Sequence, residues 1–285
     1  MTAASRYKVS TFWIVIAAAS LLANVAARAA EPIVALASGG DVDTVFIARA
    51  NALYRGDDAG RRWTRVALPA EIRDGAIATL AAPAKRQGVL YLAGPGFGVW
   101  HSADGGRSWV ARNNGLPSLD VAALAAHADQ PDTLYTYVPG KGVFRSEDAG
   151  ARWKWIDNGP RGPIGQFIHS NMPGSMQTGW LFAATPKGVS RSMDCFCLWQ
   201  DAGGLVAAVT TVAYDPREPK HVYAATAKGL LLSTDGGEEW TLLSAPASRI
   251  TALAVSPTGT VFLGTADGGL YRSNDQAKSW ERVDA

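Results

Sequence analysis

The sequence contains very little cysteine. Only two of its 285 residues are cysteines, Cys195 and Cys197, and they stand two positions apart. A chain with so few cysteines cannot be a disulfide-stapled scaffold, so its stability must come from a packed core. A chain of this length is long enough to form one.

The cysteine pair leaves three alternatives: a strained local disulfide, a metal site, or two reduced side chains. The Cα separation and torsion of a disulfide are hard to reach so close in sequence. A metal would need further ligands at suitable spacing, and the four histidines form no recognisable ligand motif. We predict no metal site and no cofactor. We interpret the histidines as ordinary strand or loop residues: His101, His127, His169 and His221.

The sequence also lacks any apolar run of membrane-spanning length. Near the N-terminus, Arg6 and Lys8 precede an uncharged run over residues 9–27. Its strongly apolar part, residues 12–22, is well short of the roughly 20 residues that a spanning helix needs. This order is typical of a secretory signal peptide. We predict cleavage after Ala29 and a periplasmic or secreted protein, with an uncleaved anchor as the alternative.

A charge excess of one sign is missing as well. Removal of residues 1–29 takes three of the 27 basic residues and none of the 25 acidic ones, leaving 24 against 25. A protein so close to neutrality has no overall field to hold nucleic acid or an anionic membrane. We therefore predict no nucleic-acid partner, and charge-driven binding requires a local patch.

An eight-residue motif occurs six times. The copies read GDDAGRRW, SADGGRSW, SEDAGARW, SMDCFCLW, STDGGEEW and SNDQAKSW, beginning at Gly56, Ser102, Ser146, Ser192, Ser233 and Ser273. Aspartate holds the third place and tryptophan the eighth in every copy. A motif that returns every 40–46 residues indicates one supersecondary unit per repeat, with four short strands as its expected content.

Alternating apolar residues around the motifs support four strands per repeat. In the last repeat such runs cover residues 250–255, 260–264 and 270–272, and a fourth run begins at Trp280. Turn residues separate the runs, which is the usual strand and hairpin pattern. We predict an all-β, six-bladed β-propeller over residues 30–285. Each blade has four antiparallel strands, and the motif occupies the turn between its third and fourth strands.

The motif resembles the Asp-box, or BNR, repeat, with consensus S/T-x-D-x-G-x-x-W. Propellers with this repeat include sialidases, xyloglucanases, sortilin-like receptors and photosystem II assembly factors. We expect the aspartate to cap its turn, the glycine to permit positive φ, and the tryptophan to pack on the sheet. Each motif would then be a staple within one blade rather than a catalytic loop. The fourth and sixth copies depart from the consensus, with Phe196 and Ala277 in place of glycine.

The resemblance places the motifs on the face opposite the ligand-binding one. The turns between second and third strands, and the connections between blades, then form the candidate binding face. Cations are frequent in these segments: Arg49, Lys141, Lys187 and Lys228 in the turns, and Arg73, Arg161 and Arg249 in the connections. We predict a locally basic face that grips an acidic peptide or a carboxylate ligand. The alternative is ordinary solvated turns.

Three functions remain in competition. The first is an exported, non-catalytic binding or assembly scaffold for a protein or peptide, because spacings of 40–46 residues leave little room for a catalytic insertion. The second is a glycoside hydrolase, sialidase-like or xyloglucanase-like, with a glycan as ligand. The sialidase Arg-Ile-Pro tripeptide is missing, however, and hydrolysis needs two carboxyls about 5–9.5 Å apart. The third is a redox or metal protein that uses the cysteine pair.

Overall fold

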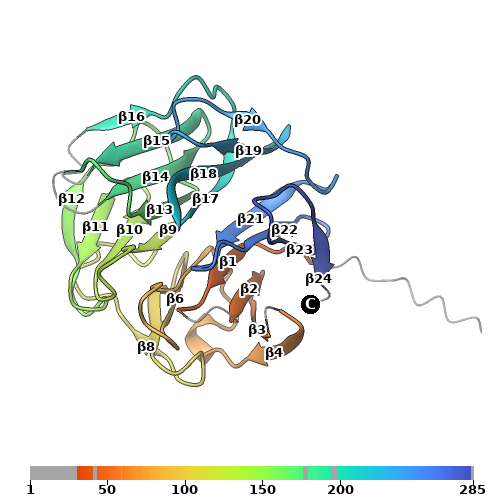
Figure 1. Ribbon diagram of the computed structural model, residues 1–285. Coiled ribbons are helices and arrows are strands. Elements are labelled where there is room, and N and C mark those ends of the chain that lie inside the picture. The colour runs from red at the N-terminus through yellow and green to blue at the C-terminus, as the bar shows by residue number, and fades with distance from the viewer. Residues whose placement is uncertain (1–30, 41–43, 59, 176–178, 194–197, 284–285) are drawn as a thin grey trace, which may run out of the picture.

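The computed structural model describes residues 31–40, 44–58, 60–175, 179–193 and 198–283. The predicted signal peptide and Asp194, Cys195 and Cys197 lie outside these residues. Six four-stranded antiparallel sheets form a β-propeller (Figure 1), which confirms the predicted fold class. The described residues contain one short 3₁₀ helix, Ala70–Ile72, and no helix long and apolar enough to cross a membrane.

Each blade is formed by consecutive strands. Blade 1 has β1 (Ala35–Ser38), β2 (Val45–Arg49), β3 (Ala52–Asp57) and β4 (Arg62–Val66). Blade 2 has β5 (Thr79–Ala81), β6 (Leu90–Gly94), β7 (Gly98–Ser102) and β8 (Val110–Ala111). Blade 3 has β9 (Ala123–Ala126), β10 (Leu134–Val138), β11 (Gly142–Ser146) and β12 (Lys154–Asp157).

The second half of the ring repeats this plan. Blade 4 has β13 (Gln166–Ser170), β14 (Trp180–Thr185), β15 (Gly188–Met193) and β16 (Trp199–Asp201). Blade 5 has β17 (Val209–Asp215), β18 (Glu218–Thr226), β19 (Gly229–Ser233) and β20 (Thr241–Leu242). Blade 6 has β21 (Ile250–Val255), β22 (Val261–Thr265), β23 (Leu270–Ser273) and β24 (Glu281–Val283).

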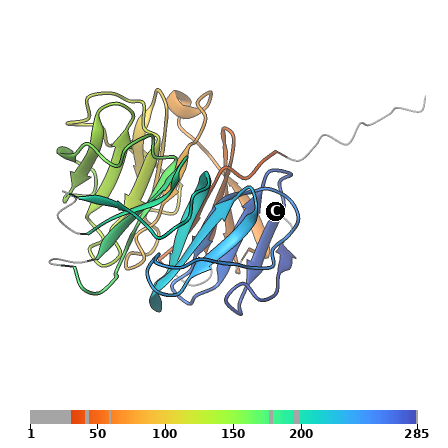
Figure 2. The same ribbon diagram turned by 90° about the horizontal axis from the view of Figure 1, so that it is seen from above.

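Because consecutive strands of each blade are antiparallel, their turns lie alternately at the two faces of the ring. The first strands contact one another in cyclic order around the axis, and Figure 2 shows the same sheets from a second direction. Turns from first to second and from third to fourth strands lie at one face, which we call the motif face. Turns from second to third strands and the connections between blades lie at the other, the connection face.

The core consists of six apolar layers, one between each pair of neighbouring blades. In β6, Leu90 and Leu92 face blade 1, whereas Tyr91 and Ala93 face blade 3. Successive strand residues point to opposite faces of a sheet, so a blade between two others must be apolar on both. This explains why every residue of β6 is buried.

Packing between the first and last blades closes the ring. Ile33 and Leu36 pack with Phe262 and Val283 in one apolar layer. The Ile33 N–H donates to the Thr265 carbonyl at 3.2 Å. Each described sheet consists of four consecutive strands, so the blades meet by packing and without an exchanged strand.

The repeated motif forms a hydrogen-bonded turn between third and fourth strands. Asp104 Oδ1 accepts the N–H of Ser108 at 2.8 Å, and Ser102 Oγ accepts the N–H of Gly106 at 2.8 Å. Ser102 also donates to Asp104 Oδ1 at 2.8 Å. The Ser108 hydroxyl also donates to Asp104 Oδ2 at 2.6 Å, and this bond, with those from the Ser108 N–H and the Ser102 hydroxyl, holds the pKa of Asp104 well below its usual range. The carboxylate thus caps the turn, as its sequence position predicts.

The sixth motif adopts the same backbone without the consensus glycine. Its Gln276 and Ala277 have φ values of 61° and 66°, where the second motif has Gly105 and Gly106 at 71° and 90°. The Ala277 N–H still donates to Ser273 Oγ at 2.8 Å. Because positive φ is unfavourable for residues with a Cβ, the hydrogen bonds and packing must hold this turn.

The motif tryptophans correct one expectation, that each motif is a staple within a single blade. Five of the six indole N–H groups, all but that of Trp63, donate to acceptors of the preceding blade: Ala67 O for Trp109, Arg112 O for Trp153, Asp157 Oδ1 for Trp199, Ala202 O for Trp240 and Ser244 O for Trp280. Four of these acceptors are carbonyls at or just past the end of the neighbour's fourth strand, where strand pairing has stopped. The tryptophans therefore join blades.

Candidate functional site

All seven cations predicted from the sequence lie at the connection face. Arg49 ends β2, and the three lysines occupy the turns that follow β10, β14 and β18. Arg73, Arg161 and Arg249 lie in the connections after β4, β12 and β20. The turns and the connections share this face because each blade has an even number of antiparallel strands.

Five of these cations follow one another around half of the ring. This basic arc consists of Lys141, Arg161, Lys187, Lys228 and Arg249, all exposed. None of them forms a salt bridge with another described residue.

Acidic residues at this face lie mainly outside the arc. The turns of blades 3–5 and the connections that follow them contain no acid. Two acids end outer strands beside them: Asp157, which accepts the Trp199 indole N–H and the Gly159 N–H, and the exposed Asp201. The other acids of the turns and connections belong to blades 6, 1 and 2: Asp267, Glu71, Asp74 and Asp120.

Arg49 differs from the cations of the arc. Its guanidinium donates to the Glu31 carbonyl, just before β1, at 2.6 Å, and across the closure between blades 1 and 6 to the Gly268 carbonyl at 3.1 Å. Burial lowers its pKa. These contacts give Arg49 a part in holding the ring closed.

Two surface grooves contain three of the predicted cations. The groove of blade 5 is lined by residues 226–229, 243 and 245–250, has a volume of about 320 Å³ and includes Lys228 and Arg249. The groove of blade 1 is lined by residues 51–52, 65–68 and 73–74, has a volume of about 410 Å³ and includes Arg73. Both lie between a turn of the connection face and the connection that follows it.

The axial channel is narrow and polar at the connection face, where its cavity has a volume of about 40 Å³. Threonine hydroxyls there bond neighbouring blades. Thr79 donates to the Leu124 carbonyl at 3.4 Å, and Thr251 donates to the Ile33 carbonyl at 2.6 Å. The first strand of each blade is a sheet edge, and a sheet edge leaves backbone groups unpaired. The threonine hydroxyls form hydrogen bonds with some of these backbone groups.

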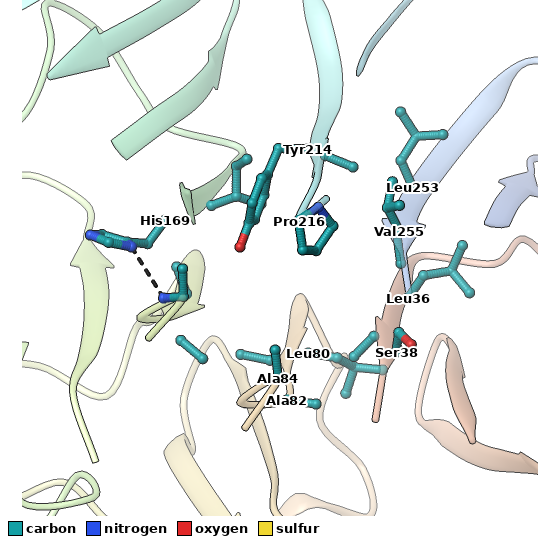
Figure 3. A pocket seen from close by; sticks show the side chains of 18 of the residues that line it. Leu36, Ser38, Leu80, Ala82, Ala84, His169, Tyr214, Pro216, Leu253 and Val255 are labelled. Carbon is teal, nitrogen blue, oxygen red and sulfur yellow. Dashed lines mark hydrogen bonds between the residues drawn. The ribbon is translucent and has the colours of Figure 1, made fainter. Parts of the chain in front are cut away.

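The channel is wider and apolar at the motif face. A cavity of about 130 Å³ is lined there by side chains from all six blades, among them Leu36, Leu80, Tyr214 and Leu253 (Figure 3). Burial raises the pKa of Tyr214. A cavity with such walls suits uncharged groups.

Two histidines beside this cavity lie in a loop and in a strand, as the sequence predicts, but they also pack against each other. The rings of His127 and His169 stack at 3.9 Å between centroids, and both side chains are buried. Each Nδ1 accepts a backbone N–H, from Asp129 at 3.0 Å and from Ala128 at 3.2 Å, the latter drawn in Figure 3. Burial lowers the pKa of His127 to about 4 and that of His169 further. The pair forms between two blades, so sequence spacing gave no sign of it.

Nothing in the described part of the chain groups three or more potential metal ligands. The four cavities described above also bring no two carboxylates together, because Asp74 is the single acid that lines any of them. These four cavities offer cations, hydroxyls and apolar side chains to a ligand.

No family model matches this chain. Part of the sequence is similar to a probable oligoxyloglucan-reducing end-specific xyloglucanase of Neosartorya fischeri, with 28% identity over 107 residues. That match covers 35% of this chain and 13% of the fungal protein, so the similar segment is a small part of its relative.

Solved structures show the same fold at low sequence identity. The structure described as YCF48 bound to D1 peptide has a TM-score of 0.60 and 17% identity, and the match covers 89% of this chain and 82% of that one. The GH74 xyloglucanase of Xanthomonas campestris has a TM-score of 0.62 and 17% identity, covering 90% of this chain and 55% of that one. YCF48 from Cyanidioschyzon merolae has a TM-score of 0.57 and 15% identity, covering 90% and 87%. Since one fold hosts many functions, these likenesses concern the fold alone.

Proposed function

We propose that this chain is an exported, non-catalytic β-propeller that binds a protein or peptide partner at its connection face. The observation that carries the proposal is the basic arc, with its five exposed cations and no salt bridge among the described residues. Loops on a rigid scaffold are common binding surfaces. Cations that face a partner's acids increase specificity and association rate.

The surrounding charge supports a local attraction. Without residues 1–29 the chain is close to neutral, so the arc is not part of a general basic surface. At physiological salt, screening limits the range of attraction between exposed charges to about 8 Å. The arc would therefore act on acids that come close to the turns, as those of a docked peptide do.

Sequence and fold give further support. The six sequence motifs are similar to Asp-box repeats, and one structural neighbour, YCF48, is described with a bound peptide. Export rests on the arrangement of charge and apolar residues over residues 1–29, and cleavage after Ala29 would leave a periplasmic or secreted protein.

A pull-down with purified protein tests this function. The bait is compared with a variant in which Lys141, Lys187 and Lys228 are changed to Glu. A matched control changes three exposed cations of the motif face to Glu: Arg107, Lys220 and Lys278. We expect a partner that the wild type and the control retain and that the connection-face variant loses. Identical partner profiles for all three proteins would refute binding at this face.

Glycoside hydrolysis is the second candidate, favoured by the 28% identity to a xyloglucanase over 107 residues. The carboxyl pair that hydrolysis needs, about 5–9.5 Å apart, has no counterpart in the four cavities described. Incubation with xyloglucan oligosaccharides, followed by a reducing-end assay, separates the two candidates. Sustained product release by purified protein would overturn the non-catalytic function.

A further inference from the structure

The blade 5 groove holds two of the arc's cations on a fixed backbone. The Lys228 N–H donates to Thr226 Oγ1 at 3.1 Å, which caps the turn and leaves Lys228 at its tip. The Arg249 carbonyl accepts the Ala266 N–H of blade 6 at 2.9 Å. Both side chains are exposed, so they extend from ordered positions toward solvent.

Apolar residues form the floor between these cations. Leu243 and Ala245 pack on the layer between blades 5 and 6, and Ile250 belongs to that layer. With about 320 Å³, the groove is at the lower end of the range for ligand pockets, about 300–1,000 Å³. This size suits the last residues of a peptide better than a folded domain.

No acid lines this groove. The neighbouring Asp267 of blade 6 is engaged, because the Thr265 hydroxyl donates to it at 2.5 Å. Hydrogen bonding, chiefly from the Thr265 side chain, lowers the pKa of Asp267, so this carboxylate stays charged near neutral pH. Lys228 and Arg249 form no salt bridge with a described residue.

We infer that the blade 5 groove anchors the acidic end of a peptide. A carboxylate lies between Lys228 and Arg249, and an apolar side chain next to it covers Leu243 and Ile250. Arginine is suited to this contact because its planar guanidinium binds a carboxylate through two parallel hydrogen bonds. The inference rests on the proposed function and assigns the partner's chemistry to one groove of the connection face.

The blade 1 groove provides an internal comparison. It contains Arg65 and Arg73, but Asp74 lines it too. An acid inside the groove repels a ligand carboxylate and compensates part of the positive charge. We therefore expect the same peptide to select blade 5, although the two grooves occupy equivalent places.

The probe is an acetylated pentapeptide that ends in alanine, leucine and glutamate with a free C-terminal carboxylate. Its neutral counterpart has glutamine and a C-terminal amide. Calorimetry gives affinities, and amide chemical shifts of isotope-labelled protein locate the site. The groove variant is Lys228→Gln with Arg249→Gln, and the matched variant, at the motif face, is Arg107→Gln with Lys278→Gln. All four side chains are exposed, so both variants should fold, which thermal unfolding checks.

We expect the acidic probe to shift amides of residues 226–229 and 243–250. The groove variant should bind the acidic peptide about tenfold more weakly than the wild type does, which corresponds to about 1.4 kcal/mol. The neutral peptide should bind the wild type more weakly than the acidic peptide by the same factor. The matched variant should keep its affinity within about twofold, or about 0.4 kcal/mol.

Other outcomes overturn the inference in distinguishable ways. If only the matched variant weakens binding, the peptide binds at the motif face and the groove is wrong. If neither variant weakens it, if both peptides bind equally, or if the wild type binds neither, the groove is wrong. The pull-down then decides separately whether the connection face binds any partner.

Discussion

Acidification from pH 7 to pH 5 should destabilise this protein through its buried histidine pair. His127 and His169 are 2% and 3% exposed, and each Nδ1 accepts a backbone N–H. A protonated Nδ1 could not accept that hydrogen bond. Burial is the main cause of both lowered pKa values, and for His127 the nearby Arg145 and Lys85 add to it while Asp129 opposes it.

The sign follows from which state binds protons. Unfolded histidine has a pKa of 6.5 and the folded pair has lower values, so below pH 6.5 the unfolded chain takes up protons that the folded chain does not. Stability is present above pH 6.5 and falls as the pH decreases toward the folded pKa of about 4 for His127. One pKa unit corresponds to about 1.36 kcal/mol.

The expected loss is large on the scale of protein stability. At pH 5, about 1.5 units below the unfolded pKa, each histidine contributes a loss of about 2 kcal/mol. The pair then accounts for about 4 kcal/mol, against a typical total stability of about 5–15 kcal/mol. His101, whose pKa burial also lowers, acts with the same sign. Motif carboxylates such as Asp104 have lowered pKa values and stay ionised throughout this interval.

Urea unfolding at pH 7 and pH 5, followed by tryptophan fluorescence, measures the difference. The control is the double variant His127→Asn and His169→Asn, whose amide oxygens offer acceptors near the Nδ1 positions and do not titrate. It should be less stable than the wild type at pH 7 and should lose most of the pH dependence. A wild-type difference below about 1 kcal/mol, less than one shifted pKa unit, would refute the reasoning. So would an equal pH dependence in the double variant.

Two further substitutions test how the ring is held together. Trp153→Phe removes the 2.7 Å hydrogen bond to the Arg112 carbonyl. It should lower stability by about 1 kcal/mol more than the control Trp63→Phe does, because the buried indole N–H of Trp63 has no hydrogen-bond partner. Equal urea midpoints for the two variants would contradict the role of the indole N–H. Arg49→Met removes two hydrogen bonds, one to the Glu31 carbonyl just before β1 and one across the closure to the Gly268 carbonyl, and should lower stability by about 1–3 kcal/mol. A thermal midpoint unchanged by Arg49→Met would instead assign this residue to the ligand face.

The sequence by itself determined the blade count and the place of the motif turns. Both are local properties, because Ser102, Asp104 and Gly106 meet within five consecutive residues, and the period of the motif repeats that unit around the chain. The face that carries the seven cations also follows from strand order, since each blade has an even number of strands.

Only the tertiary structure decided what forms between blades. Arg49 meets Gly268 across 219 positions of sequence, His127 stacks on His169 from the neighbouring sheet, and the tryptophan indoles find acceptors about one repeat away. The groove that unites Lys228 with Arg249 depends on how the chain leaves blade 5. Periodicity fixes which residues occupy equivalent places, whereas packing around the ring fixes which of them touch.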